Sequence, residues 1–186
     1  AFNWGVVPVF SDQCKNAKEA FAAVSAYALS EHIIAFGDVV VVTAGVAFGK
    51  KGSTNMMMVE NIGEILVRGH KGTGGKVSGK VSIVLSSQSR TPDQLAGRLV
   101  VIPHCDDSFL PLLKHAAGVI LQNYIGDVSS EKYAALLAKT FDLAVMTRAD
   151  GAMAVLKEDE EVTLDPKRGL IYRGSEEAPS CKILSM

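Results

Sequence analysis

The sequence predicts a mixed α/β fold in two domains, and three observations carry that prediction. The run 39–42 consists of four valines, and such a β-branched run is typical of a strand covered on both faces. Segments with apolar residues at helical spacing alternate with strand-like segments along the chain. Residues 69–75 include four glycines, which favours a flexible linker between a domain at 1–68 and a second domain at 76–174, with a tail at 175–186.

The first domain is expected to run strand, helix, strand and then an antiparallel strand pair. Its helix carries Phe21, Val24 and Ala28 on one face and ends near Gly37. A strand, a helix and a second strand in this order form a parallel crossover unit. The expected ranges are a strand at 5–10, a helix within 11–36, a strand at 39–43, a glycine-rich loop at 45–52, and two strands at 53–59 and 62–67 that pair antiparallel.

The second domain is expected to alternate strands with helices and to close with two strands. Ser130 is the predicted cap of its longer helix, in which Ala134, Leu137 and Phe141 share a face. In the turn at 166–169, the proline fixes φ and the glycine permits a positive φ. The expected strands are 79–85, 99–103, 119–122, 143–146, 161–165 and 170–173, and the expected helices are 107–117 and 130–141.

The composition of the 186 residues is that of a packed soluble protein without excess charge. Lys and Arg number 19 against 20 Asp and Glu, so no attraction to nucleic acid or to an anionic membrane is expected. The longest apolar runs are too short to cross a bilayer. Cys14, Cys105 and Cys181 form no CxxC pair, which favours a reducing compartment, the cytoplasm, over a disulfide framework or a zinc site. The first four residues contain neither an initiator Met nor a signal peptide, so we expect further sequence upstream.

The stretch 37–55, GDVVVVTAGVAFGKKGSTN, closely resembles the last-but-one strand and loop of the pyruvate kinase C-terminal domain, whose pattern is roughly GDxVVVTAGxPxGxxGTTN. The resemblance extends back to WGVVPV at 4–9 and covers about the first 67 residues. Ala47 and Ser53 depart from the pattern but leave the loop glycines in place. The resemblance implies the end of an α/β regulatory domain that holds no phosphoryl-transfer chemistry, contributes to a tetramer interface and in many members binds a sugar phosphate.

The glycine-rich loop after this strand has two interpretations. Its backbone N–H groups could point at an anion, with hydroxyls and lysines as further donors, which predicts a phosphate-facing effector site. Alternatively, the glycines only satisfy the geometry of a tight β-hairpin. The resemblance places most phosphate contacts of the family upstream of Ala1, so such a site is incomplete in this chain. The candidate effector-binding residues are Gly49, Lys50, Gly52, Ser53, Thr54 and Asn55.

Residues 76–174 resemble a different unit, the phosphohistidine swivelling domain of phosphoenolpyruvate-utilising enzymes, which some bacterial pyruvate kinases carry as an extra C-terminal domain. The segment 76–81 is similar to its opening strand, 105–111 to the start of its first helix, and 161–174 to its closing hairpin. These motifs occur in the order that the family has. The resemblance implies a swivelling β/β/α domain after the partial regulatory domain.

Tyr133 aligns with the phosphorylated histidine of this family. The family's helix start, TSHAAILAR, aligns without gaps to EKYAALLAK at 131–139. A phosphate carrier needs a nitrogen nucleophile that is largely neutral near pH 7, whereas a phenol with a pKa of about 10 stays protonated and forms a stable ester. The segment 119–147 contains no histidine at all. The sequence therefore predicts no catalytic residue here and marks Tyr133 as the position of a lost phosphohistidine.

His104 is the main alternative nucleophile. It lies beside Cys105, Asp106 and Asp107 at the end of a predicted strand, a place where ligand groups collect in α/β sheets. A thiol–imidazole or metal cluster there competes with a helix start capped by an Asp, and the cap is favoured because neighbours on an extended segment point to opposite faces. No metal is predicted, because the remaining candidates fit structural or solvated roles: His32, His70, His115, the methionines 56–58 as core residues of a strand, and the acidic run 158–161 as a solvated turn.

These features lead to one main hypothesis and two alternatives. The main hypothesis is a non-catalytic C-terminal regulatory or structural piece of a bacterial pyruvate kinase. The resemblance implies that the intact parent converts phosphoenolpyruvate and ADP to pyruvate and ATP in glycolysis. It also implies Mg²⁺ and K⁺ in an upstream catalytic domain, no cofactor in this chain, and as partners the rest of the pyruvate kinase chain in a homotetramer and a phosphorylated effector. The alternatives are an effector-sensing or assembly module, and a phosphotransfer domain that uses His104.

Overall fold

The computed structural model describes residues 5–9, 14, 17–45 and 54–173. The chain divides into two compact units, with the division between Ile62 and Gly63. Within these described residues, no helix is long and apolar enough to cross a membrane.

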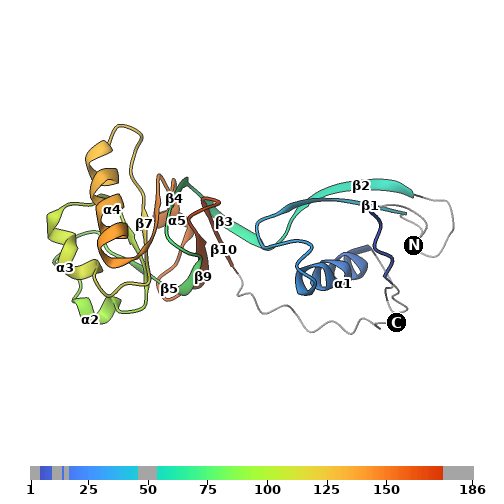
Figure 1. Ribbon diagram of the computed structural model, residues 1–186, viewed down its shortest axis with the longest axis horizontal. Coiled ribbons are helices and arrows are strands. Elements are labelled where there is room, and N and C mark those ends of the chain that lie inside the picture. Colours follow the sequence, from blue (N-terminus) through green and yellow to red (C-terminus); the bar gives the residue numbers. More distant parts are fainter. Residues whose placement is uncertain (1–4, 10–13, 15–16, 46–53, 174–186) are drawn as a thin grey trace. The chain divides into compact units, whose positions relative to one another are not determined.

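The first unit combines one helix with a two-stranded antiparallel hairpin (Figure 1). The helix is α1 (Ala17–Ser30), and the strands are β1 (Val39–Gly45) and β2 (Thr54–Asn61), with Val41 opposite Val59. Exposure alternates along both strands, so that one face of the hairpin is half-buried and the other is exposed. A slip of one residue would exchange the two faces, and the alternation therefore fixes the register.

Three details of this unit differ from the sequence-based expectations. Residues 5–9 form no strand, so the described part of the unit has no parallel crossover. The strand expected at 53–59 pairs with β1 and not with 62–67, because residues 64–68 pair with β10 of the second unit instead. The methionines at 56–58 alternate as expected, but Met57 is 71% exposed and does not belong to the core.

The second unit is built on an eight-stranded sheet. Its strands are β3 (Glu64–Arg68), β4 (His70–Thr73), β5 (Val77–Ile83), β6 (Leu99–Ile102), β7 (Gly118–Leu121), β8 (Ala144–Thr147), β9 (Glu161–Asp165) and β10 (Leu170–Arg173). Their order is β3-β10-β9-β5-β6-β7-β8-β4, in which β5 to β8 pair parallel and the other neighbours pair antiparallel. The predicted mixed α/β class, with a parallel sheet and an antiparallel hairpin, is confirmed, and the parallel strands of the described residues all lie in this unit.

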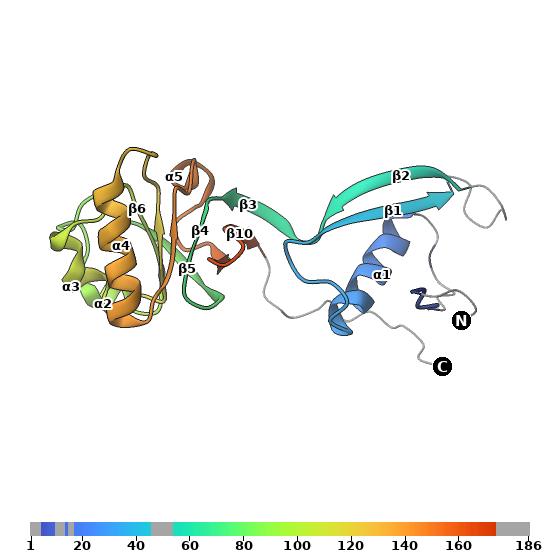
Figure 2. The ribbon, with the colours of Figure 1, turned by 45° about the horizontal axis from the view of Figure 1, so that its top comes forward.

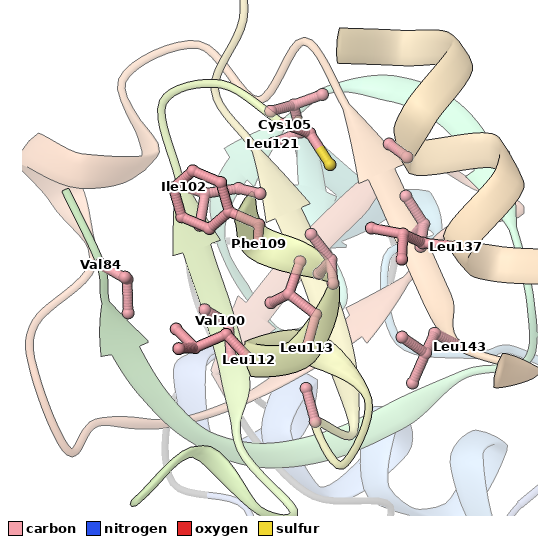
Figure 3. Packing of buried hydrophobic residues seen from close by; sticks show 14 of the residues in the cluster. Val84, Val100, Ile102, Cys105, Phe109, Leu112, Leu113, Leu121, Leu137 and Leu143 are labelled. Atoms are coloured by element: carbon pink, nitrogen blue, oxygen red, sulfur yellow. The ribbon is translucent and has the colours of Figure 1, made fainter. Parts of the chain in front are cut away.

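Apolar side chains cover both faces of the parallel strands. Strand β6 sends Val100 and Ile102 into one hydrophobic cluster and Leu99 and Val101 into another, and all four are fully buried. Figure 3 shows the first cluster, in which Phe109 packs with residues of the helices on that face. The helices of this unit are α2 (Pro92–Leu95), the 3₁₀ helix η1 (Asp107–Phe109), α3 (Leu110–Leu113), α4 (Val128–Phe141) and α5 (Ala152–Val155).

The glycine-rich segment 69–75 is not a flexible linker in the structure. Most of it forms β4, which pairs antiparallel with β8. The glycines permit a close approach of two backbones, because a Cβ added at Gly72 would lie 1.8 Å from the carbonyl oxygen of Val145. Gly74 also has a φ of +96°, which other residues rarely adopt. The glycines that predicted a flexible linker therefore allow β4 to pack closely against β8.

The boundary between the two units consequently lies earlier than the expected linker. Residues 64–68, expected to end the first domain, form β3 of the second unit and pair with β10. Only Gly69 separates β3 from β4, yet these strands lie at opposite ends of the strand order. The local sequence could not show this path, because no local pattern specifies the distant partner of an edge strand.

The acidic run 158–161 forms the expected turn before β9. Side chains of this run also contact neighbouring segments of the unit. Glu158 accepts hydrogen bonds from the Ser82 hydroxyl at 2.8 Å and from the Ile83 amide at 2.8 Å. Asp159 forms an ion pair with Arg98. These contacts give the run a structural role in addition to solvation.

Candidate functional site

The start of α4 lies where the parallel strands β6, β7 and β8 end. Ligand and catalytic groups collect at this edge in many α/β sheets. Helix α4 follows β7 and packs against β8, and Figure 2 shows it beside the sheet. The segments that follow the three strands contain residues 103–107, 122–127 and 148–150, which supply most of the polar groups discussed below.

Asp127, and not the predicted Ser130, caps the N-terminus of α4. One carboxylate oxygen of Asp127 accepts hydrogen bonds from the Ser130 amide at 3.1 Å and from the Ser129 hydroxyl at 3.0 Å. The hydrogen bonds from Ser130 are the main reason why the pKa of Asp127 is lowered. The Ser130 hydroxyl lies inside the first turn and accepts a hydrogen bond from the buried Cys105 amide at 3.0 Å. The expected cap therefore has a different task, which is to satisfy a buried donor of the neighbouring loop.

Tyr133, the predicted position of the lost phosphohistidine, lies one turn further along α4. Its ring is half-buried against the hydrophobic cluster of Figure 3. Its hydroxyl donates a hydrogen bond to Oδ2 of Asp107 at 3.3 Å. The negative charge of Asp107, and then this hydrogen bond, raise the pKa of the Tyr133 phenol above its usual value. The phenol is therefore held in its protonated, non-nucleophilic form.

His104 and Asp106 lie on the outer side of the same edge. The His104 side chain is half exposed, with Nε2 3.6 Å from Oδ2 of Asp106. Asp106 caps the short helix η1, because its Oδ1 accepts hydrogen bonds from the Ser108 amide at 2.9 Å and the Ser108 hydroxyl at 2.6 Å. These hydrogen bonds from Ser108 are the main reason why the pKa of Asp106 is lowered. The helix start capped by an Asp, which the sequence favoured, is thus the arrangement in the structure.

Cys105 points away from His104 and into the core. Its side chain belongs to the hydrophobic cluster, and Figure 3 shows the sulfur among buried aliphatic residues. Burial, with smaller contributions from the charges of Asp106 and Asp127, raises the pKa of the thiol to about 12. The thiol is therefore protonated near neutral pH, and no thiol–imidazole pair forms with His104. Among the residues that the structure describes, no group of three His, Cys, Asp or Glu side chains is placed to hold a metal ion.

An ion-pair network that sequence reasoning missed connects α4 to the segment after β8. Arg148 donates from Nε and one terminal nitrogen to the two carboxylate oxygens of Glu131, at 2.6 and 3.1 Å. Asn123 donates to Glu131 at 3.0 Å and accepts from the Arg148 amide at 2.9 Å. Arg148 holds a positive φ of 51°. The hydrogen bond from Arg148 is the main reason why the pKa of Glu131 is lowered. The available signal was positional, since Asn123 and Arg148 each closely follow a parallel strand.

The candidate effector residues are described only in part. Gly49, Lys50, Gly52 and Ser53 lie outside the described residues, while Thr54 and Asn55 are exposed at the start of β2. The other histidines are exposed. Nδ1 of His32 lies 3.1 Å from the carbonyl oxygen of Ser30, at the end of α1. His70 and His115 likewise lie at the surface.

Comparison with known families assigns a class to each part of the chain. Residues 1–60 match the family model of the pyruvate kinase alpha/beta domain. Residues 95–169 match the family model of the mobile domain of PEP-utilising enzymes. The chain therefore combines a segment similar to the pyruvate kinase alpha/beta domain with a segment similar to the mobile domain of PEP-utilising enzymes.

Individual relatives give the same result. The chain is 29% identical to the pyruvate kinase of Lactobacillus delbrueckii subsp. bulgaricus over 92% of this chain and 28% of that protein. It is 30% identical to pyruvate kinase 2 of Synechocystis sp. over 92% of this chain and 28% of that protein, and 29% identical to the pyruvate kinase of Geobacillus stearothermophilus over 94% and 29%. These matches show a C-terminal region of the pyruvate kinase type. The chain spans less than a third of the length of these relatives.

Proposed function

We propose that this chain is a non-catalytic regulatory and structural region of a bacterial, cytoplasmic pyruvate kinase. The parent would transfer the phosphoryl group of phosphoenolpyruvate to ADP, giving pyruvate and ATP, and would assemble as a homotetramer. The support is the pair of family matches, together with the similarity to the three pyruvate kinases described above. The described residues offer no three-ligand metal group. As the family resemblance implies, Mg²⁺ and K⁺ would be held by an upstream catalytic domain of the parent.

The observation that carries the proposal is the state of Tyr133. A carrier must present a nucleophilic nitrogen to the donor phosphate and release the phosphoryl group again. Tyr133 instead donates a hydrogen bond to Asp107 and packs its ring against the core. A phenol held in this way is a poor nucleophile, and its phosphate ester would be too stable for a carrier. We therefore propose that Tyr133 replaces the carrier histidine and that the mobile domain transfers no phosphate.

Incubation of the whole chain with radiolabelled phosphoenolpyruvate tests this proposal. The expected result is no acid-labile, alkali-stable label, which is the signature of phosphohistidine. A mobile domain that retains its histidine, treated in parallel, is the positive control. Acid-labile label on the chain would contradict the proposal.

His104 provides a second candidate, because its imidazole is half exposed near the start of α4. If it were a cryptic carrier, label from phosphoenolpyruvate would appear on the wild-type chain and disappear in His104→Asn. The backbone amides that would bind a phosphate beside it already donate hydrogen bonds within the protein. The Ser108 amide donates to Asp106, and the Ser130 amide donates to Asp127. We therefore expect no label on His104.

The exposed residues Thr54 and Asn55 favour a further role in effector binding. We expect a sugar phosphate or a nucleoside monophosphate to bind weakly at the loop that includes Lys50 and Ser53, because the chain holds only part of such a site. Isothermal titration of the chain should detect heat of binding. Lys50→Ala should lower the affinity about tenfold, because one charge-assisted contact is lost. Absence of heat with the wild-type chain would count against effector binding by this region.

A further inference from the structure

The amide of Ser130, in the first turn of α4, is occupied by a side chain of the protein itself. A helix of this length can bind an anion through its N-terminal N–H groups. In this chain the Asp127 carboxylate accepts the hydrogen bond of the Ser130 amide and also that of the Ser129 hydroxyl. An incoming phosphate would have to displace a carboxylate that is covalently part of the chain.

Carboxylates also lie near the hydroxyl group of Tyr133. Asp107 accepts a hydrogen bond from this hydroxyl, and the charges of Asp107 and Asp106 both raise the pKa of the phenol. Burial is the main reason why the pKa of Cys105 is raised, and the charges of Asp106 and Asp127 add to the effect of burial. Two separate groups, a phenol and a thiol, thus experience a negative potential at this place.

The cations near this edge do not cancel that potential. Arg148 is committed to Glu131 through two hydrogen bonds. His104 lies 3.6 Å from Asp106, and it is charged only when protonated. A phosphoryl donor carries negative charge, so it would approach against the field of three carboxylates.

We infer that Asp107 and Asp127 form a second barrier to phosphotransfer, which excludes phosphate by charge and by occupied amides. The inference rests on the proposed function, since it concerns the same position. It has a specific consequence: a histidine introduced at position 133 would not by itself restore phosphorylation. The two aspartates determine specificity by acting on the approach of the donor, and not by reacting with it.

Chemical phosphorylation with phosphoramidate tests the inference on the whole chain. In this reaction the P–N bond of the donor breaks, ammonia leaves with a proton, and a new P–N bond forms to an imidazole nitrogen. The first variant carries Tyr133→His alone. Two further variants combine Tyr133→His and Asp107→Asn with either Asp127→Asn or Asp127→Gly. Asparagine keeps the cap and removes its charge, while glycine also frees the amide and costs the helix little. All of them also carry His104→Asn, and peptide mapping separates label at position 133 from label on the exposed His32, His70 and His115.

Tyr133→His alone is expected to react slowly. Removal of both charges should accelerate labelling about a hundredfold, which is about tenfold for each charge, with the glycine variant fastest. Thermal unfolding checks that each variant is folded. If the glycine variant is not folded, the asparagine variant alone decides by its rate. Equal rates in all variants, whether fast or slow, would overturn the inference. Labelling of the wild-type chain by phosphoenolpyruvate would instead overturn the proposed function, so the two failures are distinguishable.

Discussion

Gly72→Ala is expected to lower the free energy of unfolding of the second unit by roughly 4 kcal/mol or more, which is much of the stability of an ordinary domain. The added Cβ would lie 1.8 Å from the carbonyl oxygen of Val145 and 2.8 Å from its carbonyl carbon. These are backbone atoms of β8, so no side-chain rotation relieves the overlap. Strand β4 would have to separate from β8. Thermal unfolding should show a fall in Tm of about 15 °C or more.

Gly75→Ala provides the matched control from the same segment. No heavy atom lies within 4 Å of a Cβ at Gly75, and we expect its stability to change by about 0.5 kcal/mol or less. If residues 69–75 were a flexible linker, both alanine variants would behave alike. Equal melting curves for the two variants would therefore contradict the pairing of β4 with β8.

Arg148→Ala is expected to destabilise the second unit, so that it unfolds at a lower denaturant concentration than the wild type. The substitution removes a bidentate ion pair whose two side chains are only 31% and 22% exposed, and it leaves Glu131 with only Asn123 as a partner. It also keeps a non-glycine residue at a φ of 51°. Arg148→Gly loses the same ion pair but adopts this φ without strain, so it should be about 1 kcal/mol less destabilised than Arg148→Ala. Denaturant titration of the two variants measures both differences.

The pH dependence of the Arg148→Ala effect checks its origin. The ion pair lowers the pKa of Glu131 in the folded state, so its stabilisation is complete above the unfolded value of about 4.3 and is lost as pH falls through the lower folded value. The difference between wild type and Arg148→Ala should therefore be full at pH 7 and shrink below about pH 4. A difference that stays constant down to pH 2 would assign the loss to packing and not to the ion pair.

Elements with local signals were predictable from the sequence. The closing strands at 161–165 and 170–173 appear as β9 and β10 with the predicted bounds, and Gly169 between them has the positive φ that its turn requires. The parallel strands β6 to β8 and the helix α4 lie within two residues of the expected ranges. Valine-rich and leucine-rich runs between turn residues specify such elements without help from distant parts of the chain.

The polar groups at the start of α4 were predictable only in part. The sequence singled out Tyr133, His104 and Asp106, but it missed Glu131 and Arg148, which lie 17 positions apart. It also chose Ser130 as the helix cap, where the structure has Asp127. Both residues are good caps in isolation, and the choice is made by the Cys105 amide, a distant donor that requires the Ser130 hydroxyl.

The sequence by itself determined the α/β class and the two family resemblances, because residue identity and spacing are local properties. Only the tertiary structure decided that the glycines at 69–75 belong to a packed strand, that 64–68 joins the second unit, and that the Tyr133 hydroxyl lies against the Asp107 carboxylate. These features depend on contacts between residues far apart in the chain. A glycine has the same local preferences whether it gives flexibility or admits a neighbouring backbone, and only the position of that neighbour distinguishes the two.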